Sequence, residues 1–234
     1  MKTALKVDLH LHTAEDPEDR ISHDSQTLVE RAHDLGFDAI AITLHDRQLT
    51  DPRLSARARD LGIVLLPGIE RTIEGRHVVL LNFPSAAERV RNLDEIAALK
   101  AKCNGLVVAP HPFFPHSSCL RGWMDTHADL FDAVEWSYFW TAGVNFNRRA
   151  ARWASEHGKP MIGNSDLHDL RQLGRTYSLV AAEPGADAVC DAIRAGRVTL
   201  QTAPVPTSEL LQVLTGMVAR GRKAAAPGRA LATT

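Results

Sequence analysis

The chain has 234 residues, a length suited to one domain of barrel or sandwich size. Its 27 basic and 28 acidic residues give a formal net charge of −1, which argues against a general nucleic-acid-binding protein. No apolar run approaches the roughly 18–20 residues that cross a bilayer, so we expect no membrane partner. The N-terminal residues lack the apolar segment of a secretory signal. The three cysteines, Cys103, Cys119 and Cys190, are odd in number and show no metal-type spacing, so we expect a cytoplasmic protein without disulfides.

The first elements show clear periodicity. Residues 5–13 alternate with a period of two, which predicts a strand. Residues 26–36 place apolar side chains on one helical face and stop at Gly36, which is typical of a helix C-terminus. We expect further strands at 38–44, 63–70, 76–83, 105–113, 132–138, 159–166 and 176–182, and helices at 53–62, 93–102, 146–157 and 186–196.

This alternation of strands and helices indicates βα units and a mostly parallel sheet. Seven or eight such units within roughly 200 residues fit a closed, irregular barrel better than an open sheet. No glycine-rich dinucleotide loop or phosphate-binding P-loop follows any strand. From residue 215 onward the chain is basic and lacks acidic residues, so we expect a domain at 1–214 and a disordered tail at 215–234.

Histidine and carboxylate side chains gather at the expected strand ends. His10 and His12 lie two apart in the first strand and therefore project to one face. The ends of later strands carry His45, Glu70, His111, Asp166 and His168. In a βα barrel such ends converge on one rim, where active sites are built. His77 begins its strand instead, so it reaches that rim only if this strand is short or antiparallel.

These side chains have the chemistry of metal ligands. Imidazole nitrogen and carboxylate oxygen suit Zn, Mn or Fe ions. A single histidine is more often structural than a ligand, but the same chemistry at five strand ends is hard to attribute to chance. Eight groups are too many for one tetrahedral ion, so we predict two or three divalent ions, with a carboxylate such as Glu70 bridging a pair. Such a cluster activates water and binds both sides of a displacement at phosphorus.

Six segments also resemble the successive motifs of the PHP superfamily, which is named for polymerase and histidinol phosphatase. They are Asp8-Leu-His-Leu-His-Thr13, Ala41-Ile-Thr-Leu-His-Asp46, Gly68-Ile-Glu70, Arg76-His-Val-Val-Leu-Leu81, Ala109-Pro-His-Pro112 and Gly163-Asn-Ser-Asp-Leu-His168. The resemblance runs from about residue 6 to residue 200, with the motifs in family order. It implies a single-domain α/β protein with a distorted (β/α)7 barrel and a two- or three-metal cluster that hydrolyses phosphoesters.

The resemblance also implies which residues bind each ion. The first ion would be bound by His10, His12, Glu70 and Asp166, the second by His45 and His168, and the third by Glu70, His77 and His111. The second ion needs a further ligand from the loop after the first strand, for which we favour Asp19, with Asp16 and His23 as alternatives. Many relatives have Thr-Asp-His where this chain has Thr43-Leu-His45. We expect His45 to remain a ligand, but the hydrogen-bond partners that orient its ring would differ from those in such relatives.

We therefore expect a phosphatase or phosphodiesterase that hydrolyses a small nucleotide, sugar or amino-alcohol phosphate by a metal-activated hydroxide. The leaving group would take a proton from a water molecule or from a side chain such as His116 or Asp19. Arg47, Arg71 and Arg175 would bind the phosphate, although each could equally be a surface or salt-bridge arginine. The alternatives are a PHP-type nuclease on short oligonucleotides, a C–N hydrolase of the amidohydrolase type and a non-catalytic PHP-like scaffold. The near-zero net charge argues against long nucleic acids.

Overall fold

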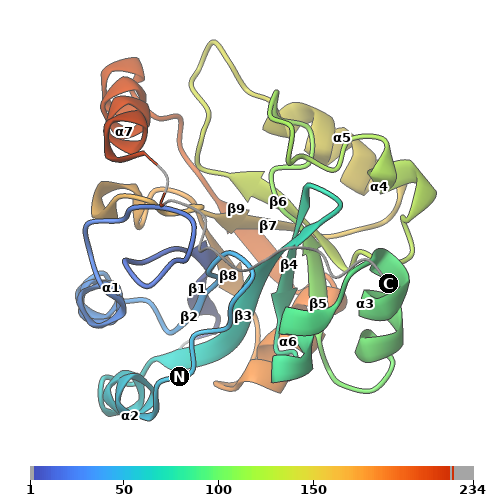
Figure 1. Cartoon of the computed structure of the whole chain (residues 1–234), viewed down its shortest axis with the longest axis horizontal. Helices are drawn as coiled ribbons and strands as arrows, with labels where there is room; N and C mark the ends of the chain where they lie inside the picture. Colours follow the sequence, from blue (N-terminus) through green and yellow to red (C-terminus); the bar gives the residue numbers. More distant parts are fainter. Residues whose placement is uncertain (1–2, 222, 224–234) are drawn as a thin grey trace.

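The computed structural model describes residues 3–221 and residue 223. Within this part of the chain, nine strands form one sheet in the order β7-β6-β5-β4-β3-β2-β1-β8-β9. The strands are β1 (Leu5–Leu11), β2 (Ala39–Ile42), β3 (Val64–Ile73), β4 (Arg76–Leu81), β5 (Leu106–Ala109), β6 (Ala133–Ser137), β7 (Met161–Asn164), β8 (Tyr177–Val180) and β9 (Val198–Gln201). Figure 1 shows them at the centre of the molecule, with the helices around them.

The sheet is mixed rather than uniformly parallel. β1, β2 and β3 are parallel, and so are β5, β6 and β7. β4 runs antiparallel to both β3 and β5, which is the reversal that His77 requires. β8 and β9 are also antiparallel to their neighbours. The sequence is therefore right about an irregular barrel, but these nine strands do not confirm a count of seven βα units.

The two sides of the sheet come together where β7 approaches β1 and β8. The Leu9 backbone N–H donates to Asn164 Oδ1 at 3.0 Å, and the Gly163 N–H donates to Ser178 Oγ at 2.8 Å. Glycine is needed at position 163, because a Cβ there would lie 2.7 Å from the carbonyl oxygen of Tyr177. These contacts nearly close the sheet, so the expected barrel is confirmed at this seam.

Short polar side chains cap the first three α-helices of the chain. Asp24 accepts a hydrogen bond from the Thr27 N–H at 2.8 Å, and Asn92 accepts one from the Glu95 N–H at 2.9 Å. The helices are α1 (Ser25–Asp34), α2 (Pro52–Asp60), α3 (Leu93–Lys100), α4 (Trp123–Thr126), α5 (Asn147–Glu156), α6 (Ala186–Arg194) and α7 (Thr207–Arg220), with 3₁₀ turns η1 (Ser85–Arg89) and η2 (Leu170–Gln172). No helix in the described part of the chain is both long and apolar enough to cross a membrane.

The helices bury their apolar faces against the sheet. α1 packs Leu28, Val29 and Ala32 into a cluster with Ile40 and Ile42 of β2. A second cluster joins α3, α4 and α5 to β3–β6, and a third joins α6 to the opposite side of the strands. Burial of these apolar side chains, which dominates the stability of such folds, fixes the strands whose ends carry the polar residues.

The C-terminal helix departs from the sequence-based expectation. α7 continues to Arg220, so the domain boundary expected at residue 214 falls inside a helix. Val213 is fully buried, so α7 is part of the packed structure. Residues 222 and 224–234 of the expected tail lie outside the described residues.

Candidate metal centre

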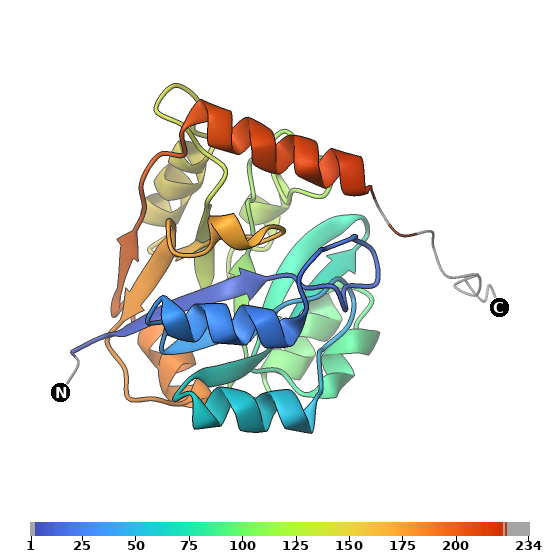
Figure 2. The same ribbon diagram turned by 90° about the vertical axis from the view of Figure 1, so that its left-hand side faces the viewer.

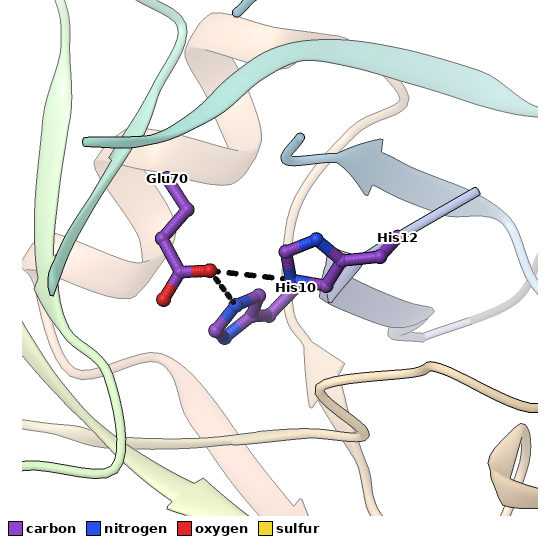
Figure 3. A group of neighbouring side chains, drawn as sticks. All are labelled: His10, His12 and Glu70. Carbon is purple, nitrogen blue, oxygen red and sulfur yellow. Dashed lines mark ion pairs between the residues drawn. The ribbon is translucent and has the colours of Figure 1, made fainter. Parts of the chain in front are cut away.

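Glu70 lies at the centre of the histidine cluster. Its Oε2 atom is 3.3 Å from His10 Nε2, 3.2 Å from His12 Nε2 and 3.3 Å from His45 Nε2. Figure 3 shows the imidazoles of His10 and His12 turned toward the same Glu70 oxygen. His10 lies in β1, His12 directly follows β1, and His45 follows β2. Glu70 lies within β3, which continues beyond the strand end expected at residue 70. Three neighbouring parallel strands thus bring these side chains together.

The donor atoms have the spacing and chemistry of a metal site. A tetrahedral ion with bonds of about 2.0–2.1 Å separates its ligand atoms by roughly 3.3–3.4 Å. The Glu70–histidine distances lie close to this value, and the nitrogens are good ligands for divalent transition metals. The Nε2 atoms of His10 and His12 are also buried without a hydrogen-bond partner, an arrangement that is costly unless another group uses them. These residues therefore fit a divalent ion.

The second oxygen of Glu70 faces another pair of histidines. Oε1 lies 2.8 Å from His77 Nδ1 and 3.4 Å from His111 Nε2. His77 reaches it because β4 reverses direction and pairs His77 with Thr72 of β3. Imidazoles therefore lie at both oxygens of Glu70, which is the arrangement that a carboxylate bridging two ions would need.

Asp166 and His168 complete the cluster from the loop after β7. Asp166 Oδ1 lies 3.5 Å from the Nε2 atoms of both His10 and His12, and 3.6 Å from His168 Nδ1. Asp166 and His111 have φ values of +47° and +29°, a left-handed backbone that is unusual for residues other than glycine. Such strain often accompanies functional geometry, and here both residues face the cluster.

The grouping differs in part from that implied by the family resemblance. Side chains close enough to share an ion include His10 with His12 and Glu70, as expected. His45 groups with Glu70 and His77, whereas His168 groups with His12 and Asp166. Asp19 Oδ2 lies 3.0 Å from His168 Nε2 and 4.0 Å from His45 Nδ1, so it lies between the two histidines that the resemblance assigns to the second ion.

The three candidates in the loop after β1 have different surroundings. Asp16 is fully buried, and its Oδ2 lies 3.0 Å from the Nδ1 atoms of both His12 and His45. Asp19 Oδ2 instead lies 3.0 Å from His168 Nε2. His23 has its Nε2 3.0 Å from the His12 carbonyl oxygen, which places it behind the histidines.

Asp16 sets the orientation of the imidazole rings of His12 and His45. Its burial raises the carboxyl pKa, but hydrogen bonds from His12 and His45 outweigh this and hold the pKa well below its usual range. The ionised carboxylate accepts from Nδ1 and leaves Nε2 of each ring directed at Glu70. Carboxylates in this position fix the tautomer and orientation of metal-binding histidines.

Glu135 of β6 plays a similar part for His10, and the sequence analysis missed it. Glu135 is fully buried, and its Oε2 lies 2.7 Å from His10 Nδ1. Burial lowers the pKa of His10, but Glu135, Glu70 and Asp166 outweigh it and raise that pKa to about 10. The available signal was a glutamate in the middle of an otherwise apolar buried strand, because a buried charge normally has a partner.

The three arginines expected to bind phosphate have other partners. Arg71 is ion-paired with Asp46 and donates to the Val90 carbonyl oxygen at 2.7 Å. Arg175 Nη2 lies 2.8 Å from Glu209 Oε2. Arg47 donates to a backbone carbonyl oxygen at 2.6 Å. None of them is among the described residues that line the cavity above the cluster, so the geometry does not support a phosphate-binding role.

That cavity has a volume of about 730 Å³. Seven of the expected site residues form its polar floor, namely Asp19, His45, Glu70, His77, His111, Asp166 and His168. His116 also lines it, with Nδ1 2.8 Å from Ser118 Oγ. Of the aromatic run at 136–140, Phe139 lines the cavity, whereas Tyr138 is fully buried.

Comparisons with known proteins agree with the fold. A family model described as PHP-associated matches residues 144–198. No curated protein matches the sequence. A solved two-domain protein from Bacteroides vulgatus, described as containing a predicted PHP-like metal-dependent phosphoesterase, is 20% identical, with a TM-score of 0.66 over 92% of this chain and 70% of that one.

Two other solved structures are also similar. PsfC from Pseudomonas syringae is 15% identical, with a TM-score of 0.65 over 94% of this chain and 98% of that one. The lesion-specific endonuclease PfuEndoQ from Pyrococcus furiosus is 18% identical, with a TM-score of 0.60 over 84% of this chain and 57% of that one. The family model over residues 144–198 and the fold shared with these structures support the resemblance of the six sequence motifs to the PHP superfamily.

Proposed function

We propose that the protein is a metal-dependent phosphoesterase that acts on a small phosphate ester. The observation that carries this proposal is the position of Glu70, whose two oxygens face five imidazoles beneath an accessible cavity. Divalent ions bound there would supply positive charge for the phosphoryl oxygens and lower the pKa of a water molecule. The similarity to a PHP-like phosphoesterase supports the reaction class.

The protein residues would hold the reacting groups and move the proton. Glu70 and Asp166 would hold the ions against the imidazoles, and Asp16 and Glu135 would keep those rings in their tautomers. Burial raises the pKa of Asp19, but its contact with His168 outweighs this and lowers it, so Asp19 stays ionised near neutral pH. An ionised carboxylate does not donate a proton. His116 is therefore the better general acid of the two candidates in the cavity.

A nuclease that cleaves short oligonucleotides is the second candidate. The specific support is the similarity to the Pyrococcus furiosus endonuclease, of which this chain covers 57%. The described cavity lining contains no lysine or arginine to bind successive phosphates, and such contacts dominate nucleic-acid affinity. For this reason we favour a small ester.

The proposal is tested by metal content and phosphate release in the same preparations. We expect bound Mn, Fe or Zn in the purified protein, and release of phosphate from simple monoesters or of the alcohol from simple diesters. Asp166→Ala should strongly reduce both the metal content and the hydrolysis. Glu183→Gln, a change of an exposed carboxylate away from the cavity, serves as the control and leaves both unchanged. Absence of bound metal after reconstitution, or phosphate release unaffected by Asp166→Ala, would refute the proposal. Cleavage of a short oligonucleotide in preference to every monoester would favour the nuclease.

A further inference from the structure

We infer that the substrate carries a bulky, uncharged apolar group, which binds between α7 and the cluster of histidines and carboxylates around Glu70. This inference rests on the proposed phosphoesterase function and specifies the class of ester. It follows from three features of the cavity, namely the side chains of its walls, the way α7 is held in place and the charges of its lining.

The upper walls of the cavity are apolar. The loops after β5 and β6 contribute Phe114, Phe139, Val144 and Phe146. α7 contributes Leu210, Leu214 and Met217, which are spaced by four and three residues and therefore share one helical face. Val144 and Phe146 are 55% and 39% exposed, respectively, so apolar surface is available to a ligand.

Both ends of α7 are tied to the barrel, so this wall is a fixed part of the site. Near its start, Glu209 accepts a hydrogen bond from the Tyr138 hydroxyl at 2.8 Å and lies 2.8 Å from Arg175. Near its end, Arg220 donates to the carbonyl oxygen of His168 at 3.1 Å. Figure 2 shows α7, in red, as a long helix lying over the orange segment that follows β7.

The charges in the cavity also select against a polar or polyanionic substrate. No lysine or arginine is among the described residues of the lining, whereas Asp19, Glu70 and Asp166 form part of the floor. A second phosphate or a carboxylate on the substrate would therefore meet no lysine or arginine in the described lining, and between the apolar walls its charge would lose water without gaining a partner. An apolar group would instead remove the aromatic and aliphatic walls from water, which is favourable in proportion to the area buried. The volume of about 730 Å³ is that of a site for a drug-sized molecule.

The inference is tested with two aryl phosphates of similar size and opposite polarity, 4-tert-butylphenyl phosphate and 4-carboxyphenyl phosphate. The carboxylated phenol is the better leaving group, so chemistry alone would favour that ester. We expect kcat/KM to be higher for the tert-butyl ester by at least about tenfold, since one or two methylene groups in an apolar pocket discriminate by that much. The non-hydrolysable 4-tert-butylbenzylphosphonate should bind more tightly than its 4-carboxy analogue by a similar factor.

Two leucines on the same helix provide a matched pair of variants. Leu214→Ser changes the cavity wall, whereas Leu211→Ser changes a side chain that is 60% exposed and does not line the cavity. We expect Leu214→Ser to reduce the preference for the tert-butyl compounds by about tenfold, mainly through KM, and Leu211→Ser to leave it unchanged. Circular dichroism checks that both variants remain folded.

The outcomes separate this inference from the proposed function. Equal kcat/KM for the two esters, equal binding of the two phosphonates, or equal effects of the two serine variants would overturn the inference alone. If no ester is hydrolysed but the tert-butyl phosphonate still binds preferentially, the proposed function fails and the apolar site stands. If neither ester is hydrolysed and neither phosphonate binds, both are overturned.

Discussion

Asp16 accepts two hydrogen bonds from His45, one from the backbone N–H and one from the ring Nδ1, each at 3.0 Å. His45 therefore has a carboxylate partner although the residue directly before it, Leu44, is apolar. The acidic residue on the other side, Asp46, is paired with Arg71 and accepts from the Thr72 N–H at 2.9 Å. Support for His45 therefore comes from the loop after β1, and Asp16 supports His12 in the same way.

Asp16→Asn should weaken metal binding without removing a side chain that faces the cavity. The amide keeps the volume but loses the negative charge between His12 and His45, and loss of such a supporting group typically costs 10- to 100-fold in metal affinity. The affinity is measured by competition with a chromophoric chelator. Glu183→Gln, which changes an exposed carboxylate away from the cavity, is the comparison. An unchanged affinity in Asp16→Asn would contradict this role.

Glu135→Gln should lower the pKa of His10 in the metal-free protein. The carboxylate lies 2.7 Å from His10 Nδ1 and is the largest of the groups that raise this pKa to about 10. Its replacement by a neutral amide removes that attraction, so the ring should lose its proton at lower pH. NMR titration of the histidine resonances in metal-free protein measures the shift, with Glu183→Gln as a surface control. The same titration curve for His10 in both variants would show that Glu135 does not act on this ring.

Asp8→Asn should stabilise the metal-free protein above neutral pH. Asp8 is fully buried, and burial raises its carboxyl pKa from 3.8 to about 7. The native state therefore binds more protons than the unfolded state between these values, so the free energy of unfolding falls as pH rises from about 4 to 7. Asparagine remains neutral and avoids this loss, which amounts to at most about 4 kcal/mol.

Urea unfolding of metal-free wild type and Asp8→Asn at a series of pH values checks this prediction. The difference between the two proteins should be small near pH 4 and largest above pH 7. A constant difference across this range would mean that Asp8 does not change protonation there. Other groups of the cluster also titrate, but they are common to both proteins.

Divalent metal should raise the melting temperature, and chelation should lower it. Ions that bind only the native state stabilise it in proportion to the logarithm of their concentration over the dissociation constant. The cluster otherwise keeps buried imidazole nitrogens of His10 and His12 without hydrogen-bond partners. Calorimetry of the chelated protein with added Mn or Zn measures the shift. In His12→Ala the metal-dependent shift should be much smaller, and a full shift in that variant would place the binding elsewhere.

Much of the site could be predicted from the sequence because its signals are local. A strand with two histidines two residues apart projects both to one face whatever surrounds it. Histidines and acids at the ends of successive strands share one rim once a barrel forms. In the structure these side chains do come together, with imidazoles at both oxygens of Glu70.

Only the tertiary structure decided how the remaining groups are used, because their roles depend on residues distant in the chain. The reversal of β4 brings His77 to Glu70. Glu135 meets His10 across 125 positions of sequence. Arg175 pairs with Glu209 of α7 instead of facing the cavity, since that helix lies across the barrel. Periodicity and motif spacing report the direction of a side chain along its own element, whereas its partner is set by how the elements pack.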